Sequence, residues 1–252
     1  MRLLATVTLL LALASVRARA DEVDEFLAEL DGRYYTPANH GAQSLTCRAD
    51  VLGLKEGGAD EAKITLYWQA PDGKAARIEG APKDWQEYIK EMEADAQEEV
   101  DLVVPPTWSQ WASSYDVKMS EDGDKTKLEA TPKADSREAK KGVKAWVLWF
   151  DGDLKLARRE RRLEGSSTRY EETWKETDGK EFYLDTVTES LIDGEGKESG
   201  SHVRTYTWQK QGDLLLLVNE KDGGGIKEHK DETNFLDYRI NPEIDAAIFG
   251  GK

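Results

Sequence analysis

The alternation of apolar and polar positions in the second half of the chain predicts a sheet. From residue 114 onward, short β-leaning runs are separated by Asp-Gly pairs, which suit the positive φ angles of tight hairpin turns. Several runs alternate polar with apolar side chains, as in a sheet with one covered and one solvated face. The runs are residues 143–150, 167–174, 181–190, 202–208 and 214–218, and the Asp-Gly pairs lie at 122–123, 151–152, 178–179, 193–194 and 222–223. Hairpins in succession predict an antiparallel meander.

The first third of the chain begins with a predicted helix and continues with strands. Apolar residues recur at helical spacing over residues 21–30, and Gly32 would end that helix. Three β-leaning runs follow at residues 44–54, 62–70 and 75–78, and the turn Pro71-Asp72-Gly73 joins the last two.

Residues 84–104 predict a longer amphipathic helix, because their apolar positions fall on one side and Glu and Gln fill the other. The apolar positions are Trp85, Ile89, Met92, Ala96, Val100 and Val103. Asp84 is a suitable N-cap, and Pro105-Pro106 would end the helix. A second, shorter helix is expected to carry Trp108 and Trp111.

Together these elements predict an α+β fold. We expect a large curved antiparallel sheet, an incomplete β-barrel, with a few helices covering one face. No equal-length repeat accompanies the turns, which argues against a propeller or a solenoid. The prediction is therefore a single domain over residues 21–252.

The first twenty residues have the pattern of a secretory signal peptide. Arg2 precedes the apolar run 3–16, and Ala18-Arg19-Ala20 offers a cleavage site after Ala20. The apolar run is shorter than the roughly 20 residues that a bilayer-spanning helix needs. No other segment is apolar enough to span a bilayer. We therefore expect an exported protein, periplasmic or secreted, with no membrane span after signal cleavage.

The charge balance narrows the classes of partner. Asp and Glu number 50 against 35 Lys and Arg, which gives a formal net charge of −15. A nucleic-acid-binding protein needs a basic face, and an anionic membrane surface repels an acidic protein. With 8 Trp, 9 Tyr and 5 Phe the chain is also too aromatic for disorder. We expect a folded, acidic protein that does not bind nucleic acid.

Cysteine and histidine usage favours neither a disulfide framework nor a metal site. Cys47 is the single cysteine, and a lone cysteine is most simply a small buried apolar residue. His40, His202 and His229 are far apart and lack metal-ligand spacing. The acid-rich loop at residues 120–124 lacks the ligand order of an EF-hand, so a solvated turn is expected there.

No motif for covalent catalysis or phosphate binding is present, so we expect a non-enzymatic protein without a cofactor. The sequence lacks the G-x-S-x-G elbow and the phosphate-binding loop. The many carboxylates leave one enzymatic alternative open, a secreted carbohydrate-active hydrolase that uses a carboxylate pair. Another alternative is an envelope scaffold whose sheet edge or aromatic patch binds a protein.

The eight tryptophans suggest what the sheet and helices enclose. Those in predicted strands are Trp68, Trp146, Trp149, Trp174 and Trp208, and those on or near predicted helices are Trp85, Trp108 and Trp111. One interpretation is close core packing between sheet and helices. Another is that some of them line an apolar cavity, because a curved sheet with a helical lid tends to enclose one. A strip that stacks on sugar rings is a third interpretation.

Short motifs also occur in an order that resembles a known family. They are Tyr34-Tyr35 after the first helix, Tyr67-Trp68-Gln69-Ala70-Pro71-Asp72-Gly73, Leu128-Glu129-Ala130-Thr131-Pro132-Lys133, Leu148-Trp149-Phe150-Asp151, Phe235-Leu236-Asp237-Tyr238-Arg239-Ile240-Asn241 and Ile248-Phe249. With the export signal, this layout resembles the LolA/LolB-type lipoprotein-localisation family and the related outer-membrane lipoprotein-sorting-like proteins. The resemblance implies an incomplete β-barrel whose helical lid covers a hydrophobic cavity for acyl chains. It also implies an arginine that holds the lid, for which Arg48 and Arg77 are the candidates.

The leading hypothesis is an exported binding protein that holds a lipid, an acyl chain or a lipoprotein in an apolar cavity between sheet and lid. The expected partner is a lipid or a lipid-modified protein, and an envelope protein is a further candidate. The residues expected to line the cavity are Leu66, Trp68, Trp146, Leu148, Phe150, Tyr206 and Trp208 from strands and Trp85, Ile89 and Met92 from the lid.

Overall fold

The computed structural model describes residues 21–52, 62–81, 83–85, 87–223 and 232–250. The chain divides into two compact units. Unit 1 comprises Met1–Tyr34, Thr107–Tyr183 and Ser190–Ser199, and unit 2 comprises Tyr35–Pro106, Leu184–Glu189 and Gly200–Lys252. The predicted signal peptide at residues 1–20 lies outside the described residues. In the part of the chain that is described, no helix is both long enough and apolar enough to cross a membrane.

Within the described residues, twelve strands form an antiparallel sheet in the order β3-β2-β1-β12-β11-β10-β9-β8-β7-β6-β5-β4. Their bounds are β1 Ser44–Val51, β2 Lys63–Gln69, β3 Gly73–Glu79, β4 Tyr115–Asp122, β5 Lys125–Pro132, β6 Ala145–Phe150, β7 Leu156–Arg162, β8 Ser167–Glu176, β9 Phe182–Ile192, β10 Glu198–Gln211, β11 Leu214–Asp222 and β12 Glu232–Ile240. The sheet stays open, with β3 and β4 as its edges. The predicted fold class, α+β with a large open antiparallel sheet, is therefore confirmed.

The predicted Asp-Gly turns are present, but the aspartates act differently from the expectation. In the Asp-Gly pair at 122–123, Gly123 has a positive φ of 68°. In the hairpins after β6 and β9, Asp151 and Asp193 instead accept hydrogen bonds from backbone N–H groups two and four residues ahead, at 2.9 Å each. The positive φ angles fall later, at Leu154 and Gly196. Longer loops with an aspartate acceptor therefore replace the two-residue turn.

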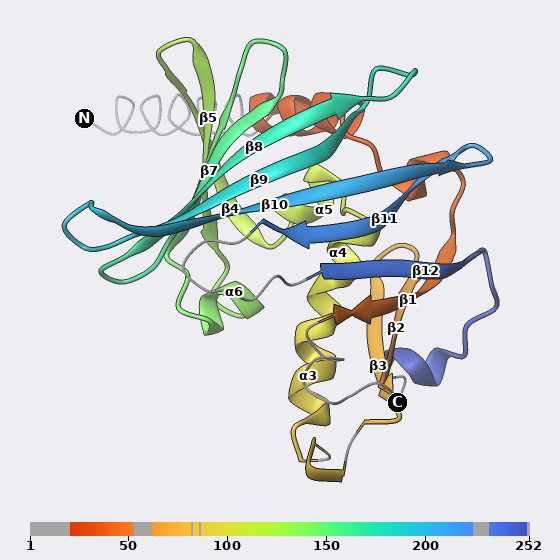
Figure 1. The fold of residues 1–252 in the computed structure, drawn as a ribbon. Coiled ribbons are helices and arrows are strands. Elements are labelled where there is room, and N and C mark those ends of the chain that lie inside the picture. The colour runs from red at the N-terminus through yellow and green to blue at the C-terminus, as the bar shows by residue number, and fades with distance from the viewer. Residues whose placement is uncertain (1–20, 53–61, 82, 86, 224–231, 251–252) are drawn as a thin grey trace, which may run out of the picture. The chain divides into compact units, whose positions relative to one another are not determined.

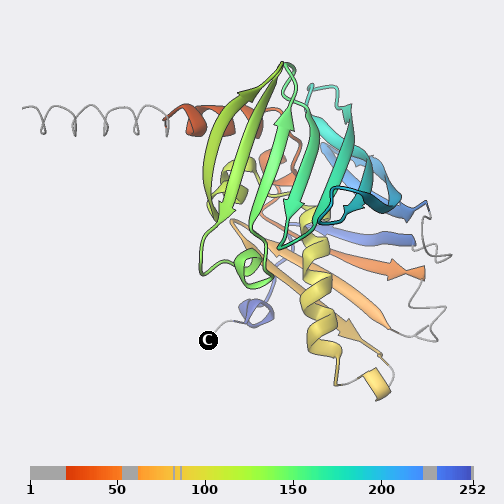
Figure 2. The same cartoon turned by 90° about the vertical axis from the view of Figure 1, so that its left-hand side faces the viewer.

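Unit 1 is built around the helical residues 21–31, as the apolar spacing predicts. Gly32 ends the helix, since its N–H bonds to the carbonyl groups of Ala28 and Glu29. The helix packs on one face of the strands of this unit. In Figure 2 these strands are green and lie in front of the helix. The core residues are Leu27, Leu30, Tyr34, Ala112, Leu128, Leu148, Phe150, Leu156 and Phe182.

Aromatic rings pack edge to face within this core. The Tyr34 ring meets those of Trp108, Trp174 and Phe182 edge to face at 4.9–5.5 Å between centroids. Its hydroxyl donates a hydrogen bond to the Leu154 carbonyl at 2.9 Å. Trp108 begins the predicted short helix α5, Trp108–Ala112, which carries a capping box formed by Thr107 and Gln110. The one-turn helix α6, Arg137–Lys140, was not predicted.

Strand β7, Leu156–Arg162, has five charged residues among its seven, yet it pairs with β6 on one side and with β8 on the other. Two of its arginines, Arg158 and Arg159, lie over neighbouring aromatic rings. The guanidinium of Arg158 lies 3.8 Å from the centre of the Trp149 ring, and that of Arg159 lies 4.8 Å from Tyr170. These stacking contacts explain how a charged segment becomes a central strand.

Unit 2 contains β1, β2, β3, most of β10, β11 and β12 together with a helical segment. The segment consists of η2 Lys83–Trp85, α3 Ile89–Ala96, η3 Gln97–Glu99 and α4 Val100–Val103, and the short helices η1 Pro37–His40 and η4 Ala246–Phe249 lie elsewhere in this unit. In Figure 1, α3 (yellow) runs beside β2 and β3 (orange). Cys47 is buried in β1, as expected of a lone cysteine.

The prediction of one helix over residues 84–104 with Asp84 as N-cap is wrong in its details. The α-helix begins at Ile89 after Tyr88, whose side chain makes no capping hydrogen bond. A 3₁₀ turn then interrupts it at Gln97–Glu99. An α-helix has 3.6 residues per turn and a 3₁₀ helix has 3.0. Over only three residues these periods place side chains in similar directions, so the spacing of apolar residues in the sequence could not distinguish the two kinds of helix. The predicted end holds, because α4 stops before Pro105.

Candidate ligand-binding cavity

A cavity of about 390 Å³ lies in unit 2 between the helical segment and the sheet. Its apolar lining consists of Ala49, Val51, Ile64, Leu66 and Ile78 from the strands and Met92 and Ala96 from α3. Its polar lining consists of Asp95, Glu99, Arg204, Glu220, Asp222 and Thr233. The volume falls within the range of small-molecule pockets, roughly 300–1,000 Å³. The cavity thus has an apolar part and a charged part.

Strand register brings the apolar lining to one face. Ala49 pairs with Ile64, and Ile64 pairs with Ile78, so the three side chains stand in a row across β1, β2 and β3. Leu66 follows two residues later on the same face and is 1% exposed. This floor is part of the core of unit 2, whereas α3 above it has no buried residue of its own.

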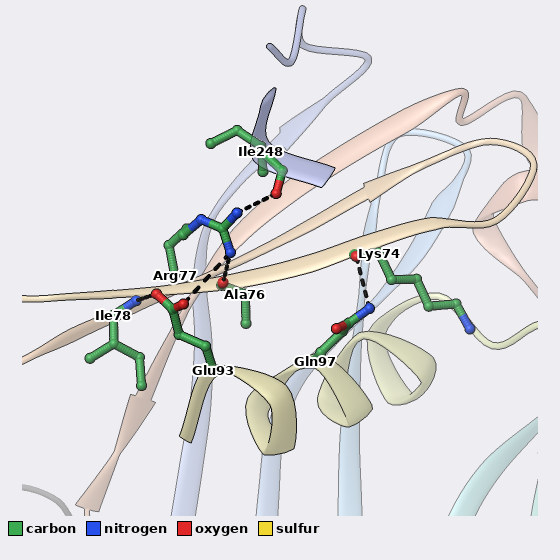
Figure 3. A network of polar contacts seen from close by, with 7 residues as sticks. All are labelled: Lys74, Ala76, Arg77, Ile78, Glu93, Gln97 and Ile248. Carbon is green, nitrogen blue, oxygen red and sulfur yellow. Dashed lines mark hydrogen bonds and ion pairs between the residues drawn. The ribbon is translucent and has the colours of Figure 1, made fainter. Parts of the chain in front are cut away.

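Polar contacts hold α3 and η3 against β3, as Figure 3 shows. Glu93 Oε1 accepts a hydrogen bond from the Ile78 backbone N–H at 3.1 Å, and Gln97 Nε2 donates to the Lys74 carbonyl at 2.8 Å. One turn further, Asp101 pairs with the Lys74 ammonium. Glu93, Gln97 and Asp101 are spaced four residues apart, so they form one stripe along the helical segment. We call this stripe, Glu93, Gln97 and Asp101, the polar stripe.

The polar stripe satisfies backbone groups of an edge strand. Alternate residues of β3 point their N–H and C=O groups away from β2, and Ile78 and Lys74 are among them. Arg77 completes the arrangement, because its Nη1 donates to the Ala76 carbonyl at 2.8 Å and lies 3.7 Å from Glu93 Oε2. Its Nη2 also donates to the carbonyl of Ile248. Helix and strand are thus joined by hydrogen bonds on one side of the cavity.

The two arginines that the resemblance singles out have different neighbours. Arg77 contacts Glu93 of α3 and so helps to hold the helix. Arg48 instead pairs with Asp237 of β12 at 3.0 Å.

The charged part of the cavity lies at the middle of β10 and the end of β11. Arg204 Nη1 is 3.6 Å from Glu220 Oε1, and its Nη2 is 3.6 Å from Glu189 Oε2. His202 Nε2 lies 3.4 Å from the same Glu189 oxygen and 3.9 Å from Asp222 Oδ2. The register of β10 and β11 sets this arrangement, since Arg204 pairs with Asp222.

Glu99 faces this cluster from the helical segment. Its Oε2 is buried and accepts no hydrogen bond from any described residue. Burial is the main cause that raises the pKa of Glu99 from 4.5 to about 7, and the carboxylate of Glu220 raises it further against the attraction of Arg204. Burial likewise raises the pKa of Glu220, which Arg204 opposes. Both carboxylates are therefore costly to keep ionised where they stand.

Two of the ten predicted lining residues, Leu66 and Met92, line this cavity. Trp68 and Tyr206 are buried in unit 2, at 4% and 7% exposure, and Trp208 Nε1 donates to the Leu184 carbonyl at 2.7 Å. Trp85 and Ile89 are half-buried in η2 and α3. These five belong to the same unit as the cavity but are not among its lining residues.

The other three predicted residues lie in unit 1. Leu148 and Phe150 belong to its core, and Trp146 packs against that core while its Nε1 donates to Glu138 at 3.2 Å. The structure therefore does not bring the ten residues together around one cavity of a single unit. Whether any of them contacts a ligand stays a prediction.

Sequence reasoning missed Glu99, Arg204 and Glu220. A signal was present for the first two. Glu99 lies seven residues after Met92, on the apolar stripe of the predicted helix, and Arg204 alternates with Tyr206 and Trp208 on one face of its strand. A charge at such a position is a sign of an unusual environment. Glu220 lies beyond the predicted run 214–218 and had no comparable signal.

Unit 1 has a groove of about 360 Å³ at its edge strand β4. Its lining includes Val23 and Leu27 of the helical residues 21–31, Ala112 of α5, and Tyr115 and Val117 of β4. Among the described residues of this lining Asp24 alone is charged, so they form no counterpart of the charged cluster in unit 2.

Comparisons with known proteins give only distant likenesses. No protein-family model matches the chain, and no curated protein sequence matches it. The chain is similar to a DUF1329 family protein from Desulfovibrio piger, with 10% identity and a TM-score of 0.38 over 89% of this chain and 94% of that one. It is also similar to a putative outer membrane lipoprotein-sorting protein domain from Vibrio parahaemolyticus, with 10% identity and a TM-score of 0.29 over 82% and 87% of the two chains. At these TM-scores neither likeness carries a functional argument.

Proposed function

We propose that this protein is an exported, non-enzymatic binding protein that holds an acyl chain or a similar apolar group in the cavity of unit 2. The single observation that supports this proposal is the row of apolar side chains beneath a helix that does not fill the space above them. Ile64 and Leu66 are themselves buried, yet a cavity of about 390 Å³ remains beside them where close packing would leave none. Export by residues 1–20 is part of the proposal.

The polar stripe also fits a binding role. A helix held to the sheet by side-chain hydrogen bonds needs little apolar contact, so it can leave room for a guest beneath it. An apolar guest would then supply the contacts that Met92 and Ala96 lack, with a gain of roughly 25 cal/mol for each Å² of apolar surface buried.

Binding of Nile red, a neutral apolar dye, tests the proposal. We expect the full chain to bind the dye with an increase in its fluorescence and dodecanol to displace it. The variant Ala96→Phe should abolish binding, since the new ring fills the cavity. Ala94→Phe is the matched control, because Ala94 is exposed on the same helix and does not line the cavity.

Native mass spectrometry of the protein from an exporting host, followed by organic extraction, would identify a natural ligand. Failure of the unaltered protein to bind either dye or alcohol would overturn the proposal. Equal binding by Ala96→Phe and the unaltered protein would overturn its location in unit 2.

A further inference from the structure

The cavity of unit 2 is apolar at one end and strongly acidic at the other. Among its described lining residues are four carboxylates, Asp95, Glu99, Glu220 and Asp222, and one cation, Arg204. The apolar residues come from β1, β2, β3 and α3, whereas Arg204, Glu220 and Asp222 come from β10 and β11. A molecule that fills the cavity would therefore have an apolar part and a polar part at opposite ends.

The positive charge of Arg204 is already matched inside the protein. It lies within 3.6 Å of Glu189 on one side and of Glu220 on the other. A ligand anion would have to compete with these two carboxylates for the guanidinium, and would face the remaining acids as well. A carboxylate or phosphate headgroup is thus disfavoured, since like charges in a partly buried site repel strongly.

Glu99 supplies the second observation. Its buried Oε2 accepts no hydrogen bond from the described residues, although it faces a cavity that Arg204 and Glu220 also line. Nearly all buried polar atoms in proteins have a hydrogen-bond partner in the protein or in bound molecules, so an acceptor of this kind can take a donor from a ligand. A donor that is also positively charged would relieve the repulsion between Glu99 and Glu220.

We propose that the cavity is specific for an amphiphile with a protonated amine, whose chain lies against Ile64 and Leu66 and whose ammonium group donates to Glu99. This inference rests on the proposed function and adds the chemical class of the headgroup. An ammonium has N–H donors, whereas a quaternary ammonium has charge but no donor.

Four probes with the same chain test the inference: dodecylamine, dodecyltrimethylammonium, dodecanol and dodecanoate, each measured by displacement of Nile red from the full chain. We expect dodecylamine to bind about tenfold more tightly than dodecanol, as for one charge-assisted hydrogen bond, and dodecanoate to bind most weakly. Dodecyltrimethylammonium should be weaker than dodecylamine because it cannot donate.

The variant Glu99→Gln should remove most of the preference for dodecylamine over dodecanol. Glu91→Gln is its matched control, since Glu91 is exposed on α3 and does not line the cavity. A preference that survives Glu99→Gln would overturn the role of Glu99.

The pH dependence gives an independent measurement. The carboxyl groups and the cation that face Glu99 are Glu98 of its own segment and Glu220 and Arg204 of the sheet. Because the pKa of Glu99 is raised to about 7, the affinity for dodecylamine should increase several-fold between pH 6 and pH 8. The affinity of the Glu99→Gln variant should change less over the same range.

The outcomes separate the two proposals. If no probe displaces the dye from the unaltered protein, the proposed function fails. If dodecanol displaces it but dodecylamine is no better, or dodecanoate is better, the proposed function stands and the amine specificity is overturned. If the quaternary ammonium equals the primary amine, the hydrogen bond from an N–H donor is overturned.

Discussion

The two helices that cover the sheet are held in opposite ways. In unit 1, residues 21–31 place Leu27 and Leu30 in the core, and the Phe26 ring meets Phe150 edge to face at 5.5 Å between centroids. In unit 2, α3 buries no residue and is joined to β3 by the polar stripe. The helix of unit 1 is thus held by apolar side chains that enter the core, whereas α3 is held by polar contacts along one side.

This difference underlies the proposed location of the binding site in unit 2. Apolar side chains alone do not mark a binding site, since Phe150 and Phe182 lie in the core of unit 1 and line neither cavity. The candidate site is instead a cavity whose lining combines apolar side chains, such as Leu66, with a buried polar atom that has no described hydrogen-bond partner, Glu99 Oε2.

The largest expected effect comes from emptying the core of unit 1. Phe150 is 0% exposed, so Phe150→Ala should lower the free energy of unfolding by roughly 3–5 kcal/mol. Met92→Ala in unit 2 should cost only about 1 kcal/mol, because Met92 is half-buried and already borders empty space. Urea denaturation of the full chain measures both. Equal losses would remove the contrast between the two units.

A smaller effect, of opposite sign, is expected at the charged end of the cavity. The pKa of Glu99 is raised on folding from 4.5 to about 7, so ionisation of Glu99 destabilises the folded protein progressively between these pH values and fully above them. Glu99→Gln should therefore stabilise the protein by roughly 1–3 kcal/mol at pH 8 and leave it unchanged near pH 4. Thermal denaturation at both pH values is the measurement. A variant that is destabilised at pH 8 would contradict the raised pKa.

The smallest effect concerns the polar stripe. Glu93→Ala removes the acceptor of the Ile78 N–H and should cost about 1 kcal/mol. Hydrogen exchange at the Ile78 amide should become faster, while the amide of Leu156, which donates to the Tyr34 hydroxyl at 2.6 Å in unit 1, should exchange as before. Unchanged exchange at Ile78 would show that α3 is held by other contacts.

Much of the fold could be predicted from the sequence because the patterns are local. The helix over residues 21–30, the short helix at Trp108 and Trp111 and most strands follow from the spacing of apolar residues. Strand β7 has little such spacing, and its arginines are accommodated by rings of β6 and β8, such as Trp149 and Tyr170. Whether such a segment forms a strand depends on its contacts with neighbouring strands, and a single run of residues does not reveal those contacts.

The candidate site could be predicted only in part. Leu66 and Met92 followed from the expectation of a cavity between strand and helix. The charged residues did not, because Glu99 and Arg204 are far apart in the sequence and meet only through the order and register of the strands. The predicted set also drew Trp146, Leu148 and Phe150 from strands that belong to the other unit.

The contacts between the polar stripe and β3 also bear on how the protein behaves at high concentration. An exposed edge strand can recruit a strand from another molecule and so begin aggregation. The Ile78 N–H and the Lys74 carbonyl are already engaged by Glu93 and Gln97, so a foreign strand finds neither free at this edge. The helix thus takes the place of a neighbouring strand.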